Sequence, residues 1–157
     1  MWKKLKPYLI SIFVALAVGG LSAIITSGNM DLYRDIVKPP LSPPSVAFPI
    51  VWGILYVLMG ISAAMIYTST NAGKEDIASA LKTYAVQLGI NFFWSILFFN
   101  FRAFLLSYLW LVLLLVFICI MTIKFRKIRK SAAYLQVPYL LWVFFAGYLN
   151  LMIWILN

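Results

Sequence analysis

The chain alternates between long apolar stretches and short polar connections. Because a helix needs about 20 apolar residues to span a bilayer, five stretches qualify: residues 8–26, 46–68, 83–101, 104–123 and 132–156. None of them contains Asp, Glu, Lys or Arg. Backbone groups in lipid must bond within their own segment, which predicts helices. We therefore expect an all-α membrane protein, a single five-transmembrane-helix bundle over residues 1–157.

The composition narrows the possible functions. The 157 residues are 64% hydrophobic and 11% charged, with a mean hydropathy of +0.97, whereas a soluble domain is nearer to half apolar and a quarter charged. A soluble enzyme or a disordered chain is thus excluded as the main interpretation, and one cysteine excludes a disulfide scaffold. Histidine, the commonest metal ligand and general base, does not occur. We predict no metal site and no cofactor.

The basic residues predict an orientation. With five spans, Arg34, Lys38 and Arg102 lie on one side of the membrane, and ten basic residues lie on the other. The positive-inside rule places the ten, and the N-terminus with them, in the cytoplasm. Their position beside the spans also explains the net charge of +9 by contact with lipid headgroups, so no nucleic-acid partner is expected. The ten are Lys3, Lys4, Lys6, Lys74, Lys82, Lys124, Arg126, Lys127, Arg129 and Lys130.

The first apolar stretch has two open questions. A signal peptide would explain its three preceding lysines, but a run of about 19 residues is long for one and no small-residue cleavage site ends it. We interpret it as the first helix. Small residues recur at every fourth position, which favours close packing either within the bundle or across a dimer; they are Ser11, Ala15, Gly19, Ala23 and Ser27.

Prolines mark two further features. The connection 28–45 contains Pro39-Pro40 and Pro43-Pro44, which block a helix and make the segment stiff. It is either a lid over the bundle, as long ordered loops often are, or a plain connector. Pro138 lies inside the fifth stretch and predicts a kink there.

Three tryptophans are the candidates for chemistry. Helical rise places Trp52, Trp94 and Trp142 about 9, 10 and 20 Å from the outer ends of their helices. Helical spacing puts polar or small residues on the same faces, and amides are costly against lipid, so these faces should point inward. The pattern predicts an aromatic pocket for an apolar ligand. That the rings only fill the core stays an open alternative. The shared faces are Trp52, Tyr56, Gly60 and Ala63; Gln87, Asn91 and Trp94; and Tyr139, Trp142, Ala146 and Asn150.

Motifs along nearly the whole chain resemble the translocator protein family, whose bacterial members are called tryptophan-rich sensory proteins. The resemblance implies a five-helix bundle, commonly a homodimer, with a pocket that is closed by the first loop and takes porphyrins, sterols and synthetic aromatic ligands. The motifs are residues 38–44 (KPPLSPP), 48–56 (FPIVWGILY) and 138–142 (PYLLW), with Met59-Gly60, Gln87-Leu88, Asn91, Trp94, Phe145-Ala146 and Leu149-Asn150.

The match also implies site residues. Leu32 and Leu41 occupy positions where the family often has Trp, so contacts from the loop to a flat ligand should be weaker. The cholesterol motif of animal members needs a basic residue near the C-terminus, and none follows Lys130. The candidate ligand-binding residues, Tyr56 among them by its inward face, are Tyr33, Trp52, Tyr56, Asn91, Trp94, Trp142, Ala146, Leu149 and Asn150.

The favoured function is a membrane receptor or sensor for tetrapyrroles such as protoporphyrin IX. One alternative is an enzyme that degrades porphyrin with light and oxygen, with Trp52 and Trp142 as the catalytic residues. Passive transport of porphyrin or sterol comes third, and a scaffold that binds nothing comes last. The expected partners are an apolar ligand, membrane lipid and a second copy in a homodimer, and the expected location is a bacterial cell membrane.

Overall fold

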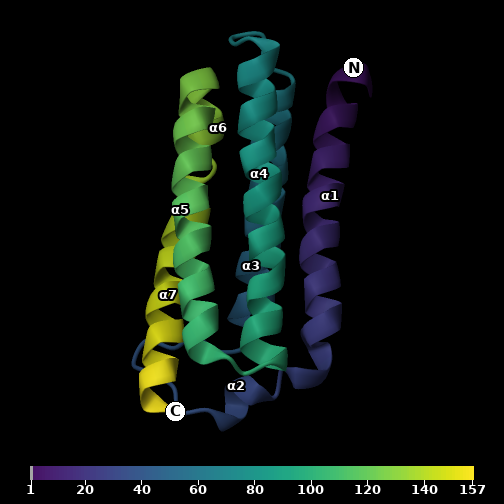
Figure 1. Cartoon of the computed structure of the whole chain (residues 1–157). Coiled ribbons are helices and arrows are strands. Elements are labelled where there is room, and N and C mark those ends of the chain that lie inside the picture. The colour runs from purple at the N-terminus through teal and green to yellow at the C-terminus, as the bar shows by residue number, and fades with distance from the viewer. Residues whose placement is uncertain (1) are drawn as a thin grey trace.

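The structure is a computed structural model that describes residues 2–157, and this part of the chain contains helices but no strands. Five long helices run alternately up and down beside one another (Figure 1). The short helix α2 and the C-terminus lie together at one end of the bundle, which we call the α2 end. The elements are α1 (Trp2–Thr26), η1 (Ser27–Asn29), α2 (Leu32–Asp35), α3 (Ala47–Tyr67), α4 (Lys74–Ser95), the π-helix η2 (Ile96–Asn100), α5 (Phe104–Ile128), α6 (Lys130–Tyr134) and α7 (Val137–Leu156).

The all-α fold is confirmed, and the membrane spans are confirmed in part. Four helical segments of the described chain are long and apolar enough to cross a membrane: Trp2–Asn29, Ala47–Tyr67, Phe104–Ile128 and Lys130–Leu156. Helix α4 is as long as its neighbours, but its first turns carry Lys74, Glu75, Asp76 and Lys82. A fifth crossing, by α4, therefore stays a prediction.

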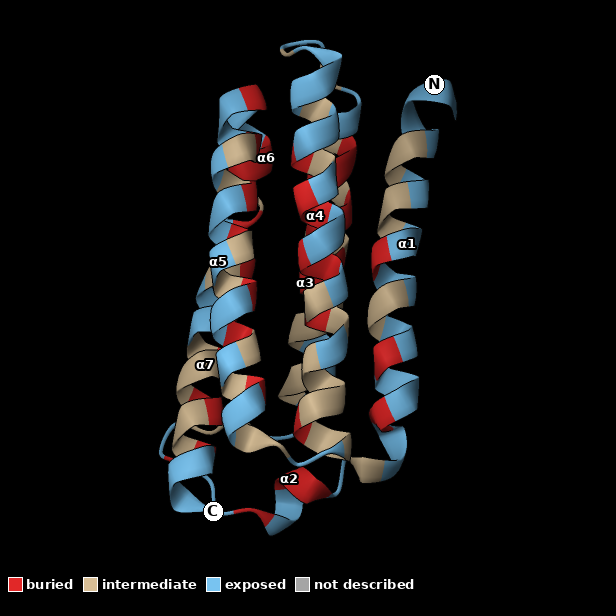
Figure 2. Cartoon of the chain, viewed as in Figure 1, coloured by how far each residue is buried: buried red, intermediate tan, exposed pale blue. Residues whose placement is uncertain are grey.

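The exterior of the bundle is apolar. Buried positions face inward and exposed positions face outward along the helices (Figure 2). The outward side chains include Phe13, Phe144 and Leu141, which are 72%, 69% and 63% exposed. Soluble proteins rarely expose so much contiguous apolar surface. Lipid chains are the environment that this surface fits.

Two glycines let α1 and α3 approach closely. A Cβ atom on Gly60 would lie 2.5 Å from the Ile12 Cα, and one on Gly19 would overlap the Tyr56 ring. Ala15 is fully buried at the same contact. When helices pack in lipid, small residues of this kind let the two backbones approach closely. Part of the small-residue pattern on α1 is thus used within the bundle.

Pro138 does not kink a continuous helix, so that prediction is wrong. Helix α6 ends at Tyr134, and α7 begins at Val137 with Pro138 in its first turn. Proline is tolerated there because the first-turn N–H groups have no intrahelical partner. The tight turn after η2 makes α4 and α5 antiparallel neighbours, and Arg102 in this turn has a positive φ of 51°.

We predict that Gly60→Ala lowers the thermal unfolding midpoint in detergent. The added methyl group meets backbone atoms of α1, and overpacking typically costs about 1–3 kcal/mol. Gly53→Ala in the same helix is the matched control, because no atom lies within 4 Å of its added Cβ. Alanine is favoured over glycine in a helix by about 1 kcal/mol, so the control should be neutral or stabilising. Equal midpoints for both variants would contradict the close α1–α3 contact.

Candidate functional site

A cavity of about 400 Å³ lies at the α2 end of the bundle. Four helices form its walls, and residues 30–34 cover it. Its volume is in the range of small-molecule sites, about 300–1,000 Å³. The main lining residues are Gly19, Ser22, Ala23 and Thr26 from α1, Phe48, Trp52 and Tyr56 from α3, Asn91, Trp94 and Phe98 from α4 and η2, and Ala146, Leu149 and Asn150 from α7.

Aromatic rings form one continuous wall of this cavity. The Trp52 ring centroid lies 6.4 Å from that of Trp94 and 5.7 Å from that of Tyr56. Phe98 continues the row at 5.7 Å from Trp94. Such rings offer flat apolar surface and edge or stacked contacts to another aromatic system. Within residues 2–157, no group of His, Cys, Asp or Glu is arranged to hold a metal ion.

A chain of buried hydrogen bonds runs from the cavity into the bundle. The Tyr56 hydroxyl donates to Asn91 Oδ1 at 3.0 Å, and Asn91 Nδ2 donates to the Tyr139 hydroxyl at 2.7 Å. Tyr139 donates in turn to Gln87 Oε1 at 2.7 Å. All four side chains are buried. The chain ties α3, α4 and α7 together beside the cavity.

Asn150 makes a second junction nearer to the α2 end. Its Oδ1 accepts from Trp94 Nε1 at 3.1 Å and from Ser107 Oγ at 3.0 Å, while its Nδ2 donates to the Phe104 carbonyl at 2.8 Å. This amide therefore joins α4, α5 and α7. Asn91 and Asn150 line the cavity, yet most of their hydrogen-bonding capacity is used between helices.

Tyr33 anchors the segment that covers the cavity. Its ring packs edge-on against Phe48 at 5.1 Å, and its hydroxyl donates to the Pro43 carbonyl at 2.8 Å. Burial raises the pKa of the Tyr33 phenol above its ordinary value, despite a lowering contribution from Ser42. The phenol therefore stays protonated near neutral pH and remains a donor. Leu32 is buried, whereas Leu41 is 80% exposed and outside the cavity lining.

Hydrogen bonds from the C-terminal helix fix another part of this cover, residues 37–40. The Asn157 side chain accepts from the Val37 N–H and donates to the Val37 carbonyl, both at 2.9 Å. Tyr148 donates to the Pro40 carbonyl at 3.1 Å. These three bonds fasten residues 37–40 to the C-terminal helix.

The cavity opens between α1 and α3. The end of α1 bonds to the α4 side, where Ser22 donates to the Phe92 carbonyl at 3.0 Å and Asn29 donates to Asn100 Oδ1 at 3.0 Å. No hydrogen bond between described residues joins it to the start of α3. The lining residues that are also exposed lie along this gap, which we call the mouth: Ala23, Met30, Asp31, Arg34, Ser45, Val46 and Pro49.

The cavity gathers most of the residues that the sequence predicted for a ligand site. Trp142 is the exception. Its ring packs against Phe48 at 6.0 Å and Phe145 at 5.7 Å, and it does not line the cavity. Its buried indole N–H has no hydrogen-bond partner among the described residues. The eight predicted residues that line the cavity are Tyr33, Trp52, Tyr56, Asn91, Trp94, Ala146, Leu149 and Asn150.

Sequence reasoning missed the contribution of α1. Gly19, Ser22, Ala23 and Thr26 form a wall of small side chains, which is joined to α4 by the bond from Ser22 to the Phe92 carbonyl. Gly19 and Ala23 belong to the small-residue pattern, which indicated only a packing surface. Small side chains also leave an empty space where no side chain of a neighbouring helix packs against them. A pattern of this kind is therefore compatible with a cavity wall.

The helices and their apolar exterior define a helical membrane protein with an aromatic internal cavity. The sequence model of the TspO/MBR family matches residues 11–155, and the chain belongs to this family. It is 36% identical to "Tryptophan-rich protein TspO" of Chlorobaculum tepidum, over all of this chain and 99% of the relative. It is also 36% identical to "Protein CrtK" of Rhodobacter capsulatus, over 92% and 89% of the two chains.

An animal relative matches as well. The chain is 33% identical to "Translocator protein" of Bos taurus, over 87% of this chain and 81% of the relative. The resemblance to the translocator and tryptophan-rich sensory proteins is thereby confirmed. The family and the apolar helices make this an integral membrane protein, and the bacterial relatives support a bacterial membrane.

We predict that Asn91→Leu destabilises the bundle more than Tyr56→Phe. Asn91→Leu leaves the Tyr56 hydroxyl without its acceptor and removes one partner of Tyr139, and a buried unpaired polar group costs about 1–3 kcal/mol. Tyr56→Phe removes the hydroxyl that donates to Asn91 Oδ1, so one acceptor is left without a partner but no buried donor is. Thermal unfolding in detergent measures both. A larger loss for Tyr56→Phe would show that the chain of bonds does not depend on Asn91.

Proposed function

We propose that this protein is an integral membrane receptor or sensor that binds tetrapyrroles such as protoporphyrin IX, and other flat apolar ligands, in the cavity at the α2 end. The aromatic wall of Trp52, Trp94 and Tyr56 carries the proposal, because a porphyrin is flat and apolar at its centre and can stack on indole and phenol rings. Residues 28–45 act as its lid. Membership of the family supports the same role.

The chemistry of the wall favours a metal-free ligand. The sequence has no histidine, so haem iron would have to find a methionine, cysteine or tyrosine as axial ligand. Met30, Tyr33 and Tyr56 are the residues of these types in the lining, but Met30 is exposed at the mouth and both phenols already donate hydrogen bonds, to the Pro43 carbonyl and to Asn91 Oδ1. Metal-free porphyrin should therefore bind at least as tightly as haem.

We predict that Ala146→Phe weakens protoporphyrin IX binding at least tenfold. Ala146 is buried and lines the cavity, so a phenyl ring there occupies the ligand's space. Quenching of tryptophan fluorescence in detergent measures the affinity, with haem titrated in parallel. Ala85→Phe is the matched control, because Ala85 is exposed on α4, away from the cavity lining. Equal affinities for the two variants, or haem binding a hundredfold tighter with the spectrum of ligated iron, would contradict the proposal.

A second candidate is an enzyme that degrades porphyrin with light and oxygen. Trp52 favours this function, since its indole faces the cavity and could donate an electron to an excited porphyrin or react with activated oxygen. No acid–base pair is required, which suits a chain without histidine. Trp142 is less favourably placed, because Phe48 contacts it and lines the cavity in its stead.

We predict that Trp52→Phe slows the light-dependent loss of porphyrin absorbance while it largely preserves porphyrin binding. Phenylalanine keeps an apolar ring in the wall but is a much poorer electron donor than indole. Trp142→Phe should slow the loss less, because its ring is further from the bound ligand. The rate is followed by absorbance under constant illumination with oxygen present. An unchanged rate in Trp52→Phe would remove the catalytic role.

The remaining proposals concern topology and assembly. We propose that α4 completes a five-span bundle with the N-terminus in the cytoplasm; its apolar second half and η2 extend the helical run to Asn100. Homodimer formation rests on the family resemblance, since Ala15 and Gly19 are already used between α1 and α3. Passive transfer of porphyrin or sterol ranks third, and a flux into liposomes without an ion gradient would favour it.

A further inference from the structure

The mouth holds the charged side chains of the cavity lining. Among the described lining residues, Asp31 and Arg34 are charged and the others are not. They form an ion pair with 3.5 Å between Arg34 Nη1 and Asp31 Oδ1, and their side chains are 79% and 78% exposed. Exposed pairs of this kind contribute little to stability because water and salt screen them. The pair can therefore open at small cost.

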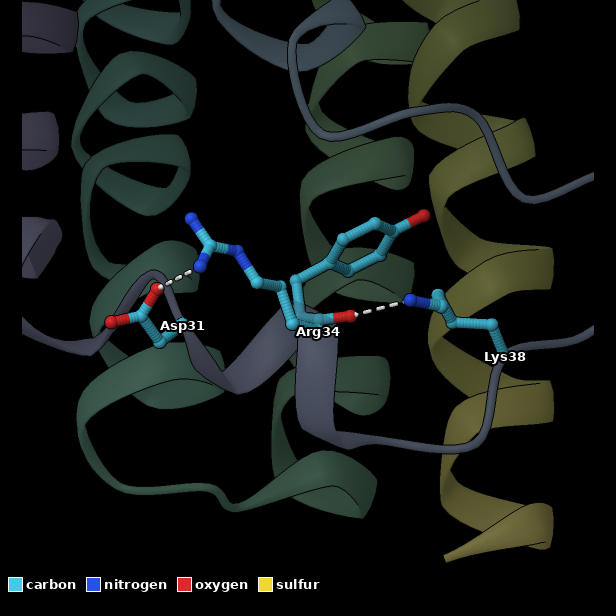
Figure 3. Close-up of polar contacts among 4 residues, drawn as sticks. Asp31, Arg34 and Lys38 are labelled. Carbon is cyan, nitrogen blue, oxygen red and sulfur yellow. Dashed lines mark hydrogen bonds and ion pairs between the residues drawn. The ribbon is translucent and has the colours of Figure 1, made fainter.

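Arg34, and not Lys38, is the cation available to a ligand. In Figure 3 the Arg34 side chain points from α2 toward Asp31, whereas the Lys38 side chain points from the following loop back toward α2. Lys38 Nζ donates to the Tyr33 carbonyl at 3.0 Å and lies 5.0 Å from the centroid of the Tyr33 ring. Lys38 also does not line the cavity. An acidic group on a ligand in the cavity would thus meet Arg34 first.

The Arg34 guanidinium has N–H groups that remain available to a ligand. It carries five N–H groups, and one contact with Asp31 leaves most of them without a protein partner in the described chain. A carboxylate matches the planar guanidinium with two parallel hydrogen bonds, which is stronger and more directional than the existing contact. The other lining residues are uncharged, and apart from Ser45 their polar side chains already form hydrogen bonds within the protein, so they offer an acidic group nothing comparable.

We infer that Arg34 is a specificity-determining residue: it binds the carboxylate of an amphipathic ligand whose apolar body occupies the cavity, and Asp31 competes with that carboxylate for the guanidinium. This inference rests on the proposed function and adds the residue that selects ligands with a carboxylic acid at the edge of a flat apolar body. The ligand then lies with its acidic edge in the mouth between α1 and α3 and its rings against Trp52 and Trp94.

The test compares protoporphyrin IX with its dimethyl ester. The two share the ring system, but the ester has no carboxylate. Because they partition differently into detergent, the informative quantity is the ratio of their dissociation constants, measured by tryptophan quenching of the full chain at low salt.

Arg34→Gln should reduce the preference for the acid by about fivefold, and Asp31→Asn should increase it. Lys38→Gln is the matched control and should leave the ratio unchanged. High salt should reduce the preference in the wild type but not in Arg34→Gln.

The outcomes separate this inference from the function on which it rests. An unchanged ratio in Arg34→Gln, with both porphyrins still bound, overturns the role of Arg34 and leaves the porphyrin receptor intact. An equal loss of affinity for acid and ester in Arg34→Gln also overturns it, because a merely structural role predicts that result. A shift of the ratio in Lys38→Gln as large as in Arg34→Gln would assign the selection to general charge at the mouth. Failure of the wild type to bind either porphyrin overturns the proposed function and this inference together.

Discussion

The structure depends on a constraint of the membrane interior, where a polar group that lacks a hydrogen-bond partner is costly. Asn91 and Asn150 satisfy it with bonds to other helices, and in doing so they set the spacing of α3, α4, α5 and α7. Helix α1 stands outside this network. It meets α3 at two glycines and leans toward α4 at the α2 end, so a space remains between α1 and α3. The cavity is thus the volume that the amide network and α1 leave unfilled.

The chemistry of the cavity follows from the same arrangement. Once the amides bond to other helices, the surface left for a ligand consists of indole, phenol and phenyl rings with small side chains opposite. Such a lining suits a flat apolar body and offers it little polar recognition. The charged residues of the lining lie at the mouth, where Arg34 of α2 is paired with Asp31. The cover is fastened to α7 through Asn157 and Tyr148, on the side away from the mouth. The apolar wall of the cavity and the charges at its mouth are therefore supplied by different parts of the molecule.

Two site residues show the limit of helical periodicity. Trp94 and Trp142 both share a face with an asparagine, and both were expected in the pocket. Trp94 lines it, whereas Trp142 lies behind Phe48. The asparagines were expected to bond a ligand, but other helices use most of their capacity. Each difference arises from a neighbouring helix, whose side chains decide whether an inward face meets a space, a ring or a hydrogen-bond partner.

The sequence by itself determined the all-α class, the apolar exterior and the family, because composition, periodicity and motif spacing are local properties of the chain. It could not decide which inward faces meet, that α1 supplies one wall, that the helix is broken before Pro138, or that the cavity opens between α1 and α3. Periodicity fixes where a side chain points around its own helix axis, but not how the helix is rotated and tilted against its neighbours. That choice depends on the fit of side chains from distant segments, such as Gly60 on Ile12 and Trp94 on Asn150, and only the tertiary structure contains it.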